Sequence, residues 1–232
     1  VFAGFKVGGG WYVDECRRCG IELNGFLNEQ KANTFFAQSD PTAQPLLARP
    51  FINAQTGAPD ALLVSFPTFA AGSVRVYTST QAYGADGGGI LNVYRSDPTC
   101  GYGGTLNLHA GFRYVELVED LRFASASTLL DGFTAPFDGK LYGAPATIEV
   151  RDTFRTENRF YGGQVGASSD FRCGRWTFAS TAKVAFGVNN QVLTIQGTSG
   201  LSDPTRGIAS QVVGGLYANA SNIGRYRNDE FC

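Results

Sequence analysis

The sequence is short of residue types that several functional classes require. It contains no methionine, one histidine, and only four lysines among its 19 Lys and Arg residues. Charged residues make up 17% of the chain and the net charge is -1, so no basic surface suited to nucleic acid is indicated. A histidine-based metal site or catalytic triad would have only His109 available. We therefore expect a protein that is not an enzyme and that carries no metal or cofactor.

Long apolar runs are also missing. No stretch of about 18 apolar residues occurs, which excludes a membrane-spanning helix. The first residues contain no signal peptide and no initial methionine, so we expect a processed form or a segment of a longer protein. What the chain does contain is 30 glycines, 18 phenylalanines and 10 tyrosines. This combination favours many strands with tight bends over helices.

Apolar and polar side chains alternate with a period of two, as they do in strands. The clearest case is 105–114, where Leu106, Leu108 and Phe112 share one face while His109 and Arg113 share the other. Ordinary strands average about 5–6 residues, whereas a tilted strand needs about 9–11 to cross a bilayer. Six stretches of about that length or longer alternate in this way: 1–13, 21–30, 81–95, 105–114, 157–172 and 175–189.

The connections between these strands differ in length at the two ends. Short turns are expected at 14–20, 96–101 and 173–174, and long loops at about 32–79, 120–150 and 196–226. Short turns at one end and long loops at the other are typical of outer-membrane barrels. We predict one all-β domain over 1–232, an antiparallel up-and-down transmembrane β-barrel of about 8–12 strands when complete. A soluble lipocalin-type barrel would instead have an apolar interior and a charged outer face. Two apolar pieces, 62–66 and 208–216, are either small extra strands or loop-packing segments.

The polar faces of the predicted strands supply candidate pore-lining residues, while the aromatic faces should contact lipid. The candidates are Lys6, Glu22, Asn24, Asp86, Asn92, Asn107, His109, Arg113, Gln164 and Lys183. Other carboxylates near the expected loop ends fit a solvated rim better than a calcium site; these are Glu116, Glu119, Asp120, Asp138, Glu149 and Asp152.

Five cysteines leave at least one without a partner inside the chain. Cys16, Cys19, Cys100 and Cys173 all fall in the short turns, so we expect them at one end of the barrel, forming two disulfides in an oxidising compartment. Three pairings of these four are possible, and the sequence does not select one. Cys232 should lie nearer the opposite end.

Five stretches carry a resemblance to a known family: LLARPFINAQTG (46–57), LHAGFRYVELVEDL (108–121), DTFRTENRFYGGQVGASSDFRCGRWTF (152–178), KVAFGVNNQVLTIQG (183–197) and LYANASNIGRYRNDEF (216–231). In order and spacing they resemble the β-barrel porin family of planctomycete-type bacteria called BBP7. The resemblance implies a barrel in the bacterial outer membrane, at the cell surface, and little about any transported solute. Members begin with a strand before the equivalent of Val1 and continue past that of Cys232, so we expect the barrel to be completed from outside the present residues.

Two functions remain open from the sequence. The first is an outer-membrane barrel with a structural or porin-like passive role, whose partner is membrane lipid. The alternative is a cell-surface protein whose long loops join copies of the same chain into an oligomeric array or filament.

Overall fold

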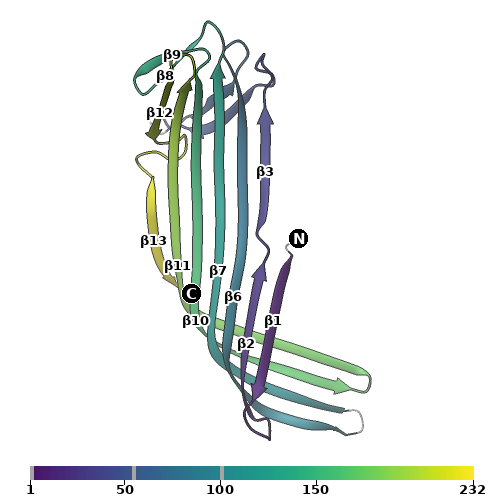
Figure 1. The fold of residues 1–232 in the computed structure, drawn as a ribbon. Coiled ribbons are helices and arrows are strands. Elements are labelled where there is room, and N and C mark those ends of the chain that lie inside the picture. The colour runs from purple at the N-terminus through teal and green to yellow at the C-terminus, as the bar shows by residue number, and fades with distance from the viewer. Residues whose placement is uncertain (1–2, 54–55, 100–101) are drawn as a thin grey trace.

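Four long strands dominate the fold. The computed structural model describes residues 3–53, 56–99 and 102–232. Each long strand has between 27 and 30 residues and pairs antiparallel with the next, so that they stand side by side in Figure 1. They are β6 (Ala70–Thr99), β7 (Tyr102–Leu129), β10 (Thr147–Cys173) and β11 (Trp176–Asp203).

Shorter strands extend this sheet on both sides. The order across it is β1-β2-β6-β7-β10-β11-β12, with β3 also paired to β6 and β13 also paired to β11. β2 and β3 follow one another along the edge of β6, and β13 and β12 share the edge of β11 in the same manner (Figure 1). The bounds are β1 (Gly4–Tyr12), β2 (Cys19–Asn28), β3 (Lys31–Gln38), β12 (Ile208–Val213) and β13 (Gly224–Phe231).

Two small hairpins lie at the end of the sheet opposite the β1–β2 turn (Figure 1). One is formed by β4 (Leu47–Ile52) and β5 (Pro59–Ser65), the other by β8 (Thr134–Phe137) and β9 (Lys140–Gly143). The second hairpin packs on the ends of the long strands and makes the main buried apolar cluster there. The members of this cluster are Ala70, Leu129, Ala135, Phe137, Tyr142, Ala146 and Leu201.

The sheet curls strongly, as one ion pair shows. Glu22 is on β2 and Lys183 is on β11, and three other strands lie between them in the sheet. Four strand spacings in a flat sheet would separate their backbones by roughly 19 Å. Nevertheless the Lys183 Nζ atom lies 2.5 Å from Glu22 Oε1. The face that carries both residues is therefore concave, and the described sheet is a half-barrel.

Glycines inside the curve make this close approach possible. Gly88 on β6 and Gly111 on β7 are directly opposite one another and face inward, in the same row as Glu22. A Cβ atom on Gly88 would lie 2.6 Å from the Gly111 Cα, closer than real Cβ contacts come. The floor of the groove is bare backbone here, which leaves space for the longer side chains of the flanking strands.

Two of the three expected short turns are confirmed, but the long loops are largely strand. The connections β1–β2 and β10–β11 are short and lie toward one end of the molecule (Figure 1). β6 and β7 end in the pair Thr99–Tyr102, and the residues between them lie outside the described part of the chain. The expected loop 32–79 contains β3, β4, β5 and the start of β6, and 120–150 contains the end of β7. The expected loop 196–226 contains the end of β11 and all of β12. The apolar pieces at 62–66 and 208–216 fall mainly in β5 and β12. The strands continue past the positions where apolar and polar side chains exchange faces. The sequence prediction ended each strand at that exchange and therefore underestimated its length.

Candidate functional site: the polar concave face and its surroundings

The concave face brings all ten candidate pore-lining residues together. Seven of them line one depression, to which β1, β2, β6, β7, β10 and β11 all contribute: Lys6, Glu22, Asn24, Asp86, His109, Arg113 and Lys183. The other three, Asn92, Asn107 and Gln164, join the same surface through hydrogen bonds. Period-two alternation thus placed these side chains on a common face, and the curl of the sheet brought them into contact.

Glu22 is the centre of one half of this network. Its Oε1 atom accepts a hydrogen bond from Lys183 Nζ at 2.5 Å and lies 3.0 Å from His109 Nδ1. Both the Glu22 and the Lys183 side chains are about seven-eighths buried. A carboxylate and an ammonium in such a position depend on each other, because either one alone would lose its hydration without compensation.

Asp86 is the centre of the other half. Its Oδ2 atom accepts hydrogen bonds from Asn24 Nδ2 at 3.0 Å, Gln164 Nε2 at 3.2 Å and Lys183 Nζ at 3.3 Å. Lys183 therefore bridges two carboxylates that come from different strands. The two amide donors, which carry no charge, share the Asp86 Oδ2 atom with the Lys183 ammonium.

His109 links the ion pairs to a row of neutral groups. Its Nε2 atom lies 2.8 Å from Ser168 Oγ, which accepts a hydrogen bond from Asn107 at 3.4 Å. Asn92 donates to Asn107 Oδ1 at 2.7 Å. Both ring nitrogens of the buried His109 thus have hydrogen-bond partners, Glu22 and Ser168, and the histidine has a structural role in this network. Among the described residues, no group of three or more His, Cys, Asp or Glu side chains is placed to hold a metal ion.

The charges of the depression do not cancel. Three cations line it, Lys6, Arg113 and Lys183, against two carboxylates, Glu22 and Asp86. Lys183 is committed to the two carboxylates. Lys6 and Arg113 make no ion pair within the described residues, so the open part of the groove is left with a positive excess.

The convex face behind this depression is apolar and carries no charge. On the six strands that form the depression, the positions facing outward alternate with the polar ones. The described outward positions from Phe5 to Trp11, Ile21 to Leu27, Tyr83 to Leu91, Leu106 to Tyr114, Tyr161 to Phe171 and Trp176 to Val188 contain no Asp, Glu, Lys or Arg. Many are large and exposed, among them Phe5, Val7, Trp11, Leu23, Phe112, Val165, Trp176, Phe178, Val184 and Phe186.

Three tyrosines mark where this apolar surface ends. Tyr83, Tyr114 and Tyr161 sit side by side on β6, β7 and β10, with ring centroids 6.5 Å and 5.1 Å apart along the row. The Tyr83 hydroxyl donates to Glu116 Oε2 at 2.6 Å, and the Tyr114 hydroxyl donates to the same oxygen. Tyr83 and Tyr114 thus have an apolar ring on one side and a polar tip at Glu116, the first charged residue beyond the row.

Beyond the tyrosine row the outer face of the sheet is charged, and this part of the sheet is the charged half. Arg159 contacts Glu116 at 3.0 Å and Glu157 at 2.5 Å, and Arg155 continues the ladder to Glu157 at 2.9 Å and Asp120 at 3.2 Å. Leu117, Leu121 and Phe123 occupy the opposite, inward face of β7. The two faces therefore exchange character near residue 115, and this inversion is the change of phase that ended the strands predicted from the sequence.

A buried ion pair on the inward face of the charged half was missed by the sequence reasoning. Asp152, expected at a solvated rim, is completely buried and accepts a hydrogen bond from Arg49 Nη2 of β4 at 2.5 Å. Its other oxygen accepts the backbone amides of Tyr217 and Ala218, at 2.9 Å and 2.8 Å. Arg49 also donates to Ser125 and lies 4.7 Å from the Tyr217 ring centroid. Asp152 therefore fastens the β4–β5 hairpin and the segment after β12 to the sheet. No local pattern joins residues this far apart, although both segments lie in stretches that carry the family resemblance.

The disulfides predicted in the turns are not formed in the described residues. Cys16, Cys19 and Cys173 are free and exposed, as is Cys232, and Cys100 lies outside the described residues. Cys19 is level with Ala167 across the sheet, six residues short of Cys173, or roughly 20 Å along the strand. A disulfide spans at most about 7 Å between Cα atoms. The β1–β2 turn is held instead by Asp14, which accepts the amides of Arg18 and Cys19 at 2.8 Å and 2.7 Å.

The fold and this face define a class: an antiparallel all-β half-barrel whose concave face is polar in one half, with a β-hairpin fastened to the sheet in the other half. Within the described residues no helix is long and apolar enough to cross a membrane. The chain belongs to the family described as Putative beta barrel porin-7 (BBP7), which matches residues 1–232. No curated protein and no solved structure matches it.

Proposed function

We propose that this protein is an outer-membrane β-barrel with a passive, porin-like or structural role. The observation that carries the proposal is the pairing of an uncharged, exposed convex face with a hydrogen-bonded polar concave face on the same strands. A soluble barrel with an apolar interior would have the opposite arrangement.

The height of the apolar face fits a bilayer. On β10 it extends from Tyr161 to Phe171, ten residue steps or roughly 33 Å along the strand. At the tilt of about 40° found in transmembrane barrels, this corresponds to roughly 25 Å across the membrane, the height of the apolar band in known examples. The tyrosine row at its border is the position where such barrels carry aromatic girdles.

The orientation follows from the turns. Outer-membrane barrels have their short turns in the periplasm. The turns β1–β2, β6–β7 and β10–β11 would then face the periplasm, and the charged half with its fastened hairpins would face outward. The alternative of a surface lattice joined through long loops loses its main premise, because those stretches are mostly strand.

Membrane insertion can be tested with two matched arginine substitutions. Val165→Arg places a charge in the apolar face, where the cost at the middle of the bilayer is about 2–4 kcal/mol. Val118→Arg places the same charge on the outer face beyond the tyrosines, near Glu116 and Asp120. The proposal expects the first variant, but not the second, to lose incorporation into liposomes in a flotation assay. Equal incorporation of both variants would refute it.

Passive transport is tested separately, by recording the conductance of the purified protein in planar bilayers. Steps of conductance support the porin-like role. Insertion without conductance would leave the structural role only.

A further inference from the structure

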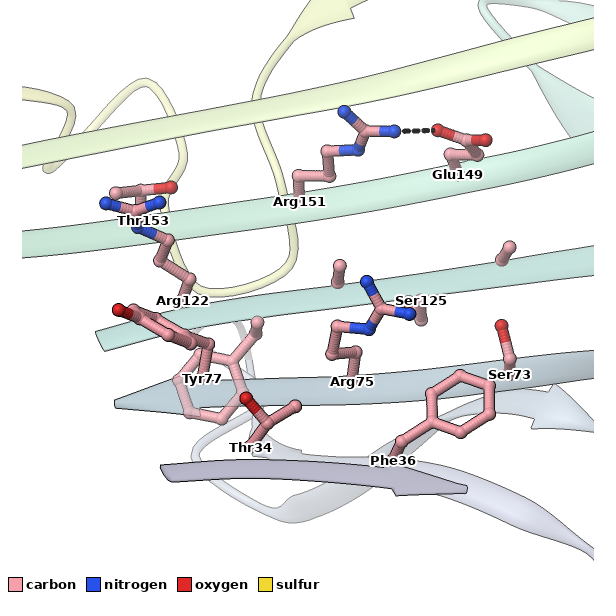
Figure 2. Close-up of a pocket in the computed structure, with 13 residues that line it drawn as sticks. Thr34, Phe36, Ser73, Arg75, Tyr77, Arg122, Ser125, Glu149, Arg151 and Thr153 are labelled. Atoms are coloured by element: carbon pink, nitrogen blue, oxygen red, sulfur yellow. Dashed lines mark hydrogen bonds and ion pairs between the residues drawn. The ribbon is translucent and has the colours of Figure 1, made fainter. Parts of the chain in front are cut away.

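A second cluster of charge, away from the concave face, lies on the outer surface of the charged half. It is a shallow depression to which β3, β6, β7 and β10 all contribute (Figure 2). Three arginines come from three adjacent strands: Arg75 on β6, Arg122 on β7 and Arg151 on β10. None of these residues takes part in the concave network or in the Arg49–Asp152 pair.

The strand register gives this depression a defined shape. Ala124 on β7 is directly opposite Arg75 on one side and Arg151 on the other. The two arginines therefore project from strands roughly 10 Å apart, with a methyl group between them. Arg122 precedes Ala124 on the same face of β7, and Ala126 follows it. Two alanines thus form a low floor, and arginines bound it on three sides.

Aromatic rings hold two of the arginines in place. The Arg75 guanidinium lies over the Phe36 ring and that of Arg122 over the Tyr77 ring, each 5.3 Å from the ring centroid. Stacking fixes the plane of a guanidinium while leaving its N–H groups free to donate. The side chains are therefore positioned before any ligand arrives, which lowers the entropy lost on binding.

The carboxylates nearby do not neutralise this cluster. Arg151 pairs with Glu149 at 2.6 Å, the contact drawn in Figure 2. Arg122 contacts Asp120 at 3.3 Å, but Asp120 is shared with Arg155. Within the described residues Arg75 makes no ion pair. Ser73, Thr34 and Thr153 add hydroxyl groups around the edge.

We infer that this depression binds a phosphate group. Planar guanidinium groups converging from several strands match the oxygens of a phosphate, which they can engage with paired hydrogen bonds. The alanine floor admits a group of this size, which a larger side chain at either position would exclude.

The position of the site points to the source of the phosphate. Arg122 is eight residues beyond Tyr114 on the same face of β7, or roughly 27 Å along the strand. If the tyrosines lie at the membrane surface, a tilt of about 40° places the site roughly 20 Å above that surface, beyond the headgroup layer of an ordinary phospholipid. At this height the phosphate would have to be carried on an extended saccharide headgroup of a glycolipid. This choice of source rests on the proposed function, whereas the phosphate chemistry does not.

The test measures binding of two probes to the full chain in detergent: bisphosphorylated lipid A and inorganic phosphate. The variant Arg75→Ala/Arg122→Ala should weaken lipid A binding at least tenfold, because two of the three guanidinium groups are removed. Glu149→Gln should strengthen it, because the one carboxylate lining the depression loses its charge. Arg227→Ala, on exposed β13, is the matched control and should change nothing.

The outcomes separate the sources and the proposals. If the double variant loses affinity for lipid A but not for dephosphorylated lipid A, the phosphate recognised is that of a glycolipid. If the double variant loses affinity for inorganic phosphate alone, the same site binds a soluble phosphate. Equal affinity of parent and double variant for both probes overturns the inference, whatever the liposome flotation result for Val165→Arg.

Discussion

Arg49 and Asp152 are 103 residues apart in the chain, yet they form an ion pair that is almost completely removed from solvent. The pair joins the β4–β5 hairpin to β10, while the second oxygen of Asp152 holds the backbone at Tyr217 and Ala218. At Gly215 there is no room for a side chain, because a Cβ atom would overlap this carboxylate. Three distant segments are thus fixed at one point.

Breaking this pair should release the hairpin. Arg49→Met or Asp152→Asn leaves the other group buried without its partner, which costs about 3–5 kcal/mol. We expect faster hydrogen exchange over residues 47–65 and new proteolytic cleavage between β4 and β5. The control is Arg206→Met, which removes a half-exposed partner of Asp203 and should cost no more than about 1 kcal/mol. Unchanged protection of 47–65 in both Arg49 and Asp152 variants would contradict the role assigned to the pair.

The concave network should behave as a coupled unit. Lys183→Met removes the cation shared by Glu22 and Asp86 and should lower the free energy of unfolding by about 1–3 kcal/mol. Adding Glu22→Gln to Lys183→Met should cost less than the sum of the single changes, because the orphaned charge is removed. Thr181→Val, at the next inward position of β11, is the control. Denaturant unfolding in detergent gives the free energy of unfolding of all four variants. Strict additivity of the two single changes would show that Glu22 and Lys183 do not interact.

The positive excess of the groove predicts anion preference. Lys6 and Arg113 face the depression without an ion-pair partner in the described residues, and unpaired cations of this kind favour anions in a pore. In planar bilayers under a salt gradient, the reversal potential should indicate anion selectivity, and Lys6→Glu/Arg113→Glu should shift it toward cations. A cation-selective parent channel would disprove this prediction and leave the barrel itself unaffected.

The β1–β2 turn should depend on pH through Asp14. Hydrogen bonds from the amides of Arg18 and Cys19 lower the pKa of the Asp14 carboxyl below its usual value. The stabilisation is then complete above pH of about 4 and is lost as the pH falls through the lowered pKa. Asp14→Ala should speed exchange of the Arg18 and Cys19 amides at neutral pH, whereas Glu15→Ala should not. The difference between parent and Asp14→Ala should vanish in acid, and a difference that persists there would exclude the carboxylate as its cause.

The alternation of side chains was enough to predict much of the fold. It identified long antiparallel strands, the β1–β2 and β10–β11 turns and a common face for all ten polar candidates from Lys6 to Lys183. The reason is local, since in a strand each residue's face depends only on its position modulo two. The same reasoning failed where the alternation changed phase. Beyond Tyr114 the polar residues pass to the outer face, and a pattern read by polarity alone ends the strand there.

The predicted disulfides failed for a related reason. The sequence placed Cys19 and Cys173 in turns, whereas they are the first residue of β2 and the last residue of β10, next to those turns. The hairpins differ in length and put the two cysteines at different levels. The level of each turn is set by how strands pair across the sheet, which no local pattern records.

By itself, the sequence determined the β class, the two-sided character of the strands and the family to which the chain belongs. Only the tertiary structure decided that Glu22 meets Lys183 and that Asp152 meets Arg49. It also placed the three arginines of β6, β7 and β10 around an alanine floor. These contacts depend on strand register and on the curl of the sheet, and both are set by packing between residues far apart in the chain.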